Sequence, residues 1–267
     1  MNKADFFDDC REDLRQIIDQ AGCRCAFAVN VRFRGQEQQC LLGDSGIFPA
    51  ASTIKLAILL ELFRGFACGR MSPDERLTVA EKDIVEGGVL PECGAGHAFS
   101  LMELARLMMI VSDNTASNLI LERVGMPAVN GLLCGLGLKY TILRRRFMED
   151  PQLRGDNTAT AEELLRLLVL LDDGVIIGEP WRGEALSIMH RQMFVEKIPA
   201  ELPAEVWTAN KVGELEGVRH DIAVLASGEL RMRLAALTQN VRCGCEGDRL
   251  ISKLAKTVWT GAAQSLR

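Results

Sequence analysis

The chain has 267 residues, of which 48% are hydrophobic and 25% are charged, enough to bury a large core in one domain or in two closely associated ones. The net charge is -5, with both signs mixed along the chain and no basic stripe, so nucleic acid is excluded as an expected partner. The apolar run at residues 56–63 is soon broken by Arg64 and Gly65. This excludes a membrane span there, and no membrane partner is expected.

The cysteines and the N-terminal stretch bear on location. The first 20 residues lack the apolar h-region of a secretory signal, and the chain holds nine cysteines, an odd number. Both features predict reduced thiols in a cytoplasmic protein. A leader removed from the natural chain would instead indicate the periplasm.

The first part of the chain is predicted to contain helices and strands in alternation. Apolar residues at helical spacing, including Phe7, Leu14 and Ile17, indicate an amphipathic helix near the N-terminus. Two short apolar runs separated by the turn "RGQ" indicate strands. The elements expected are a helix over 4–20, strands over 23–33 and 37–43, and a helix over 52–68.

The middle of the chain is predicted to be helical. Capping boxes begin at Ser72, Ser100 and Thr160. Between the helices, the polar stretch 144–157, "RRRFMEDPQLRGDN", reads as a loop of a length that is often functional. Helices are expected over 100–111, 114–124, 127–135, 160–173 and 181–194.

The end of the chain returns to strands, expected over 205–213, 218–227 and 229–239, followed by a helix over 248–261. Strands at both ends around a helical centre predict an α+β fold. The terminal strands would share one sheet that the first and last helices cover. The expected division is an α/β subdomain of residues 1–48 plus 200–267 and a helical subdomain of residues 49–199.

A hydroxyl and an amine lie one turn apart in the otherwise apolar helix at 52–68. Ser52 is a poor nucleophile unless a base lies beside it, and a lysine among apolar neighbours, such as Lys55, has a lowered pKa and can serve as that base. A serine at a helix N-terminus also lies where backbone N–H groups bind an oxyanion. The alternative is that Ser52 is only an N-cap.

Two further stretches strengthen the catalytic interpretation. Ser112-Asp113-Asn114 lies between two predicted helices, and Lys211-Val212-Gly213 ends a predicted strand. Taken singly, the first reads as a helix junction and the second as a strand that ends at a turn. All three motifs in this order are far less expected by chance.

Together these motifs resemble the S-x-x-K, S-D-N and K-T-G signature of serine β-lactamases and penicillin-binding proteins. The resemblance is closest to class A β-lactamases and β-lactamase-like serine hydrolases, and it covers nearly the whole chain. It implies a five-stranded antiparallel sheet flanked by terminal helices, a helical subdomain and an active site in the cleft between them. The implied reaction is acyl-enzyme formation on a small β-lactam, amide or ester, without a metal or other cofactor.

The resemblance also implies roles for single residues. Ser52 would be the acylated nucleophile and Lys55 its base or proton relay. Ser112 would pass a proton to the leaving nitrogen, and Asn114 would hold the amide side chain of the substrate. Lys211 would lie beside Ser112 and attract a substrate carboxylate.

The same comparison assigns the oxyanion hole to the N–H groups of Ser52 and Glu214, just past Gly213. Arg219 lies near the position at which class A enzymes carry a carboxylate-binding arginine. Val212 departs from the family pattern, since it lacks the threonine hydroxyl; a buried polar partner left unmet costs roughly 1–3 kcal/mol. A carboxylate at Glu214 is expected to repel an anionic ligand and to suit a neutral or cationic one.

A further departure concerns release of the acyl group, for which class A enzymes use a glutamate in an Ω-loop. The equivalent loop here is shorter than in class A enzymes and matches the family pattern only in part. Glu149 is the expected base, followed by Asp150, and Asn157 would be a remnant of the water-holding asparagine. If Glu149 is instead a solvated surface acid, Ser52 would be acylated but would release product slowly.

The sequence therefore leaves alternatives open. One is an intracellular amidase or esterase of the same fold, and another is a binding or sensor module that deacylates slowly. Intact Ser52, Lys55, Ser112 and Lys211 argue against an inactive scaffold. The oligomeric state is left open.

Outside the motifs, His220 is expected near the ligand, and no His–Cys spacing resembles a zinc site. The resemblance would also bring the pairs Cys23/Cys25 and Cys243/Cys245 together. A disulfide or metal clip is one hypothesis there, and free thiols are the other.

Overall fold

The computed structural model describes residues 6–265. Contacts within the chain divide it into two compact units. The first unit contains the described residues up to Thr53, then Thr160–Val169 and the chain from Phe194 onward; the second contains Ile54–Ala159 and Leu170–Met193. The expected division put residues 49–53, 160–169 and 194–199 in the helical part, whereas the contacts within the chain group them with the unit that contains the sheet.

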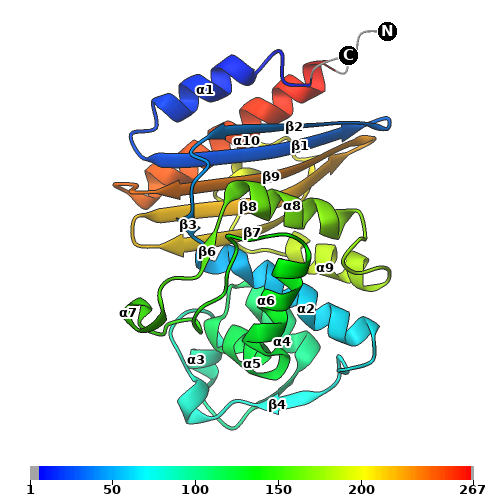
Figure 1. The fold of residues 1–267 in the computed structure, drawn as a ribbon, viewed down its shortest axis with the longest axis vertical. Coiled ribbons are helices and arrows are strands. Elements are labelled where there is room, and N and C mark those ends of the chain that lie inside the picture. Colours follow the sequence, from blue (N-terminus) through cyan, green and yellow to red (C-terminus); the bar gives the residue numbers. More distant parts are fainter. Residues whose placement is uncertain (1–5, 266–267) are drawn as a thin grey trace. The chain divides into compact units, whose positions relative to one another are not determined.

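The first unit is built on a five-stranded antiparallel sheet, as predicted, with the strand order β2-β1-β9-β8-β7 (Figure 1). The N-terminal and C-terminal strands are neighbours in it, since Ala26 of β1 pairs with Leu237 of β9. The five strands are β1 (Arg24–Phe33), β2 (Gln36–Gly43), β7 (Trp207–Leu215), β8 (Val218–Ser227) and β9 (Leu230–Gln239).

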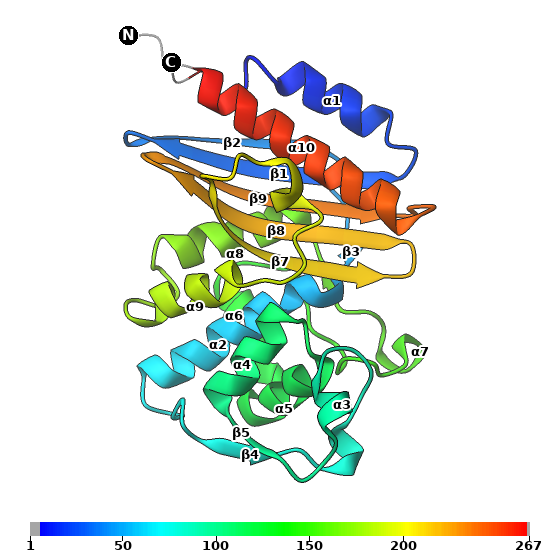
Figure 2. The same ribbon diagram turned by 180° about the vertical axis from the view of Figure 1, so that it is seen from behind.

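The central strands are buried along most of their length, which explains why their sequences run apolar instead of alternating. Helices α1 (Arg11–Asp19) and α10 (Gly244–Ser265) both lie on one face of the sheet (Figure 2). Leu14 of α1 and Trp259 of α10 join the core there. The short η3 (Ile198–Glu201) packs against α10.

The two terminal helices differ from the prediction in their bounds. The first begins at Arg11 instead of residue 4; Phe7 is still buried, but in the turn that precedes the helix, and residues 4 and 5 lie outside the described residues. The last begins at Gly244 and reaches Ser265, which extends the predicted 248–261 at both ends.

The second unit is mainly helical and is organised around α2 (Lys55–Ala67), whose residues are almost all buried. Four other helices pack against it, namely α4, α5, α6 and α9. The elements of this unit are α2, β4 (Arg76–Thr78), η2 (Glu81–Asp83), α3 (Leu90–Cys93), β5 (Ala98–Ser100), α4 (Leu101–Ile110), α5 (Asn114–Val124), α6 (Met126–Gly135), α7 (Pro151–Arg154), β6 (Thr158–Ala159) and α9 (Trp181–His190).

Helix α8 (Ala161–Asp172) begins in the first unit and ends in the second. The capping box at Ser100 is confirmed, with the Ser100 Oγ 3.1 Å from the N–H of Glu103. The one expected at Ser72 is wrong. Residues 72–75 form a turn, because the stretch that follows alternates and becomes strand β4 instead of a helix. None of the helices within residues 6–265 has the length and apolar content needed to cross a membrane.

Candidate active site

The segment that carries Ser52 has a strained backbone. Ser52 lies in η1 (Ala51–Ile54), which follows the short strand β3 (Phe48–Pro49). Ala51 has φ 47°, in the left-handed region that residues with a Cβ rarely adopt. The Thr53 hydroxyl donates to the Ala50 carbonyl at 2.6 Å and closes the turn. Such strain persists where surrounding contacts enforce it, and it gathers at functional sites.

His220 holds the chain just before this segment. The ring is fully buried, with Nε2 2.7 Å from the Pro49 carbonyl oxygen and Nδ1 2.7 Å from that of Arg219. The Thr238 N–H donates to Nδ1 at 3.1 Å. Burial lowers the pKa of His220 to about 4, so the ring is neutral. The expectation that His220 lies near a ligand is therefore replaced by a positioning role.

Strand β7 passes directly beside Ser52. A Cβ placed on Gly213 would lie 3.1 Å from the Ser52 nitrogen and 3.0 Å from the Thr53 Cγ2. Both distances are tighter than ordinary Cβ contacts, so a side chain at this position would have to displace the Ser52–Thr53 segment by a few tenths of an ångström. The structure thus brings together Ser52 and the strand end that is predicted to complete the oxyanion hole.

Lys211 is fully buried, and its ammonium donates to the Val212 carbonyl at 2.9 Å. Burial lowers the pKa of Lys211 to about 7, although the nearby Asp221 opposes this shift. Asp221 is also buried, and it accepts hydrogen bonds from the Asn210 amide at 3.1 Å and from the Ile198 N–H at 3.1 Å. Burial raises the pKa of Asp221. Two buried ionisable side chains, Lys211 and Asp221, therefore lie at the end of β7 that carries the K-V-G motif.

Glu214 is paired, which changes the electrostatic expectation for this strand end. The buried Lys197 ammonium donates to the Glu214 carboxylate and also lies 3.3 Å from Asp248. Burial of Glu214 favours its neutral form, but the Lys197 contact prevails and lowers its pKa. Because Lys197 balances the charge, Glu214 does not act as the isolated repulsive carboxylate that was expected. Sequence reasoning missed Lys197, since nothing in "EKIPAE" marks a buried ammonium.

Arg219 also makes contacts that the sequence did not predict. Its guanidinium donates to the carbonyls of Leu215 and Val218, at 3.0 and 2.9 Å, and its Nε lies 3.8 Å from Asp248. Arg219 is therefore tied into the turn between β7 and β8. Its predicted contact with a substrate carboxylate stays a prediction.

In the second unit, two of the three motifs meet at Lys55. The buried Lys55 ammonium donates to the Ser112 carbonyl at 2.6 Å and to the Asn114 Oδ1 at 2.7 Å, and its Nζ lies 3.2 Å from the Ser112 Oγ. The Asn114 amide also donates to the Glu86 carbonyl at 2.8 Å. A hydroxyl, an amide and an ammonium thus share one small volume, as proton transfer requires.

The backbone around Ser112 is held in place by Asp113. Ser112 has φ 57°, again in the left-handed region. The buried Asp113 carboxylate caps helix α5 through the Ala116 N–H at 2.8 Å and accepts from the N–H groups of Val89 and Leu90 at 2.7 and 2.8 Å. The middle residue of the S-D-N motif is therefore structural and orients the residues on either side of it.

The loop residue that faces Lys55 is Phe147. The Lys55 Nζ lies 4.6 Å from the centre of its ring, a distance typical of a cation–π contact. Asn118 fixes the backbone there, because its amide donates to the Phe147 carbonyl at 3.0 Å and its Oδ1 accepts from the Phe147 N–H at 2.9 Å. Sequence reasoning missed Phe147, although it is the one buried residue in the polar run "RRRFMED".

The predicted deacylation residues have other contacts. The Glu149 carboxylate accepts from the Arg146 N–H at 3.0 Å, and the exposed Asp150 caps α7 through the Gln152 N–H at 2.9 Å. Asn157 accepts from the N–H groups of Arg144 and Arg145. All three side chains thus stabilise the loop itself, and a catalytic role for Glu149 stays a prediction.

No group of three His, Cys, Asp or Glu side chains among residues 6–265 is arranged to hold a metal ion. The proposed four-sulfur clip is not formed in the structure. Cys25 is buried and Cys23 partly buried, whereas Cys243 and Cys245 are exposed, and all four are free thiols.

The five-stranded antiparallel sheet and its helices define the β-lactamase/transpeptidase fold. The profile of the Beta-lactamase enzyme family matches residues 9–261, so the chain belongs to this family. Among curated proteins, β-lactamase PSE-4 of Pseudomonas aeruginosa is 33% identical over 37% of this chain and 34% of its own length. β-Lactamase 3 of Bacillus cereus is 29% identical over 67% of this chain and 58% of its own length. The chain thus spans about a third to somewhat over half the length of these curated relatives.

Solved structures match over nearly the whole chain. A β-lactamase from Sphaerobacter thermophilus has a TM-score of 0.87, with 23% identity over 95% of this chain and 96% of that chain. PBP-A has a TM-score of 0.84, with 26% identity over 95% of this chain and 96% of that chain. A leucine-to-glutamate mutant of PBP-A, solved as an acyl-enzyme complex with penicillin G, matches with a TM-score of 0.85.

Proposed function

We propose that this protein is a serine hydrolase of the class A β-lactamase type that opens a β-lactam or related amide by forming an acyl-enzyme on Ser52. The observation that carries the proposal is the convergence of Lys55, Ser112 and Asn114 in the second unit. Membership of the β-lactamase family supports the same reaction.

In the proposed acylation step, Lys55 acts as a neutral amine: it accepts the proton of the Ser52 hydroxyl while the Ser52 oxygen attacks the amide carbonyl. The N–H groups of Ser52 and Glu214 stabilise the oxyanion. Ser112 donates a proton to the leaving nitrogen and regains one through Lys55. The amide C–N bond breaks, and an ester to Ser52 remains.

Deacylation is the step for which the structure offers least support. A water molecule needs a base to attack the ester, and the loop presents the ring of Phe147 to Lys55, while the Glu149 carboxylate is bonded within the loop. An aromatic ring accepts no proton. We therefore propose that hydrolysis is slow and that the acyl-enzyme accumulates, as in the penicillin-binding alternative.

The strand end at Lys211 supports an anionic substrate. With Glu214 neutralised by Lys197, the protonated Lys211 provides positive charge for a carboxylate. Val212 cannot add the hydrogen bond that a threonine hydroxyl would supply, so the carboxylate is held by charge more than by directed hydrogen bonds.

The test is intact-mass spectrometry over time with benzylpenicillin, nitrocefin and a simple activated ester, on the wild type and on Ser52→Ala. The expected result is a covalent adduct with one β-lactam per chain that persists after free ligand is removed and is absent in Ser52→Ala. Rapid turnover without accumulation would contradict slow deacylation. Reaction with the ester alone would favour the amidase or esterase alternative, and no Ser52 adduct with any of the three would contradict the proposal.

A further inference from the structure

Two cysteines form a close pair far from the motif residues in the sequence. Cys243 and Cys245 flank Gly244, the first residue of α10, and both thiols are exposed. Their Sγ atoms lie 2.7 Å apart. A disulfide brings its two sulfur atoms to about 2.05 Å, so these two free thiols need only a small further approach to join.

The two thiols differ in acidity. The Cys245 side chain and its backbone N–H both hydrogen-bond the Cys243 sulfur, and they lower the pKa of Cys243. The same contact raises the pKa of Cys245. The N-terminal end of α10 also favours negative charge on a thiolate. Cys243 is thus suited to attack and Cys245 to resolve, the division of roles that thiol–disulfide exchange needs.

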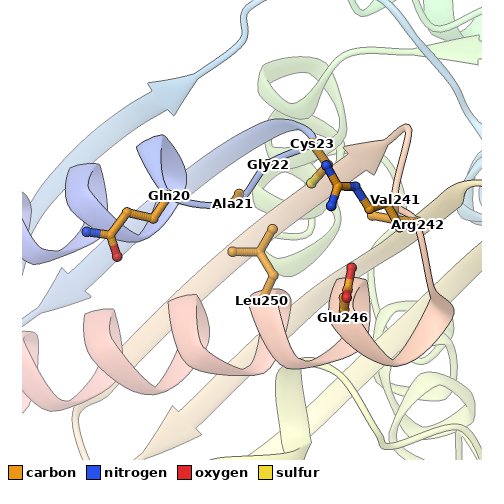
Figure 3. Close-up of a pocket in the computed structure, with 8 residues that line it drawn as sticks. All are labelled: Gln20, Ala21, Gly22, Cys23, Val241, Arg242, Glu246 and Leu250. Atoms are coloured by element: carbon orange, nitrogen blue, oxygen red, sulfur yellow. The ribbon is translucent and has the colours of Figure 1, made fainter.

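A hollow of about 280 Å³ lies between the end of α1 and the start of α10 (Figure 3); its lining includes sequence neighbours of the pair but neither Cys243 nor Cys245. Arg242 and Glu246, which precede and follow the two cysteines in the sequence, both line it. Figure 3 shows Arg242, Cys23 and Glu246 among the residues that line the hollow, with Glu246 on α10. An arginine can bind a carboxylate, and a glutamate can bind an ammonium group. The lining therefore fits a zwitterionic, peptide-like molecule.

We propose that Cys243 and Cys245 form a redox-active dithiol that reduces low-molecular-weight disulfides of peptide type. The Cys243 thiolate attacks one sulfur of the external disulfide, which forms a mixed disulfide and releases one thiol. Cys245 then loses its proton and attacks the Cys243 sulfur, which closes the internal disulfide and releases the second thiol. The dithiol loses two electrons and two protons, and the external disulfide becomes two thiols.

Cys68 provides a matched control within the same chain. It is exposed, and a hydrogen bond from the Arg70 side chain lowers its pKa. It therefore shares the accessibility and acidity of Cys243, while its hydrogen-bonded neighbour is an arginine instead of a second thiol. A thiol of this kind is expected to stop at the mixed disulfide.

The test incubates the reduced full-length protein with oxidised glutathione, then alkylates the remaining thiols and maps the peptides by mass. The expected result is an internal disulfide between Cys243 and Cys245, formed about ten-fold faster than a glutathione adduct accumulates on Cys68. Cys245→Ser should retain glutathione on Cys243. In Cys243→Ser, Cys245 should react no faster than Cys68.

Two outcomes would overturn the proposal. One is a lasting glutathione adduct on Cys243 in the wild type, and the other is a reaction at Cys243 no faster than at Cys68. Arg242→Ala should slow the reaction with oxidised glutathione but not with the uncharged bis(2-hydroxyethyl) disulfide; equal slowing would overturn the role of the hollow. The proposal goes beyond the acyl-transfer function, and the same results are expected in Ser52→Ala.

Discussion

Lys55 has two kinds of neighbour, and the difference between them separates the two halves of the proposed reaction. The turn at Ser112 brings it a hydroxyl and an amide oxygen, whereas the loop at Phe147 brings it an aromatic ring. Both segments are fixed by buried polar side chains: Asp113 holds the turn, and Asn118 of α5 holds the loop at Phe147. Under the proposed function, the first segment supplies groups for acylation, and the second places an aromatic ring at Lys55 instead of a base for hydrolysis.

The largest effect on the acylation rate is expected from substitution of Lys55, which both segments contact. Lys55→Met should slow acylation of Ser52 by benzylpenicillin about 10³-fold, because the serine loses its base. The rate of adduct formation by intact mass is the measurement, and circular dichroism shows whether the variant folds. An unchanged rate in a folded variant would remove Lys55 from the mechanism.

The loop side of the comparison is tested by Phe147→Glu, which places a carboxylate where the ring lies. Hydrolysis of the acyl-enzyme should accelerate about 10²-fold, because the new base can activate water. The measurement is the decay of the benzylpenicillin adduct after free ligand is removed.

Glu149→Gln is the matched control, since it neutralises the acid that the sequence suggested and keeps its size. Its adduct should decay at the wild-type rate. Slower decay in Glu149→Gln would identify Glu149 as the base and contradict the role given to Phe147.

A smaller effect is expected from loosening the loop. Asn118→Ala removes two hydrogen bonds to the Phe147 backbone and leaves that buried backbone unpaired. The free energy of unfolding should fall by about 2 kcal/mol, measured by urea denaturation. Asn130→Ala, which removes a similar pair of bonds to the Leu143 backbone, serves as a comparison and should leave adduct decay unchanged.

The smallest effect on acylation is expected from a substitution in the first unit, at Val212. Val212→Thr restores the hydroxyl that the family pattern carries and should speed acylation by benzylpenicillin about fivefold, which corresponds to about 1 kcal/mol. The rate with a neutral activated ester should not change. Equal acceleration with both substrates would mean that the hydroxyl acts on the reaction itself and not on a substrate carboxylate.

The sequence was informative where local pattern decides structure. The strands at both ends, the capping box at Ser100 and the helix at 114–124 follow from apolar spacing and cap chemistry. The box at Ser72 failed because the same cap residues also make a turn before a strand. Residue contacts across long loops are different: the Phe147 contact with Lys55 and the Lys197 pair with Glu214 depend on tertiary structure that no local spacing encodes.

The Asn118 clamp has a consequence for how such a protein can diversify. Both of its hydrogen bonds go to backbone atoms of residue 147, so they form whichever side chain that residue carries. The phenylalanine at position 147 can therefore be replaced by an acidic residue while the loop keeps these two backbone hydrogen bonds. If the proposed function holds, substitution at residue 147 alone would move such a protein between a long-lived acyl-enzyme and fast hydrolysis.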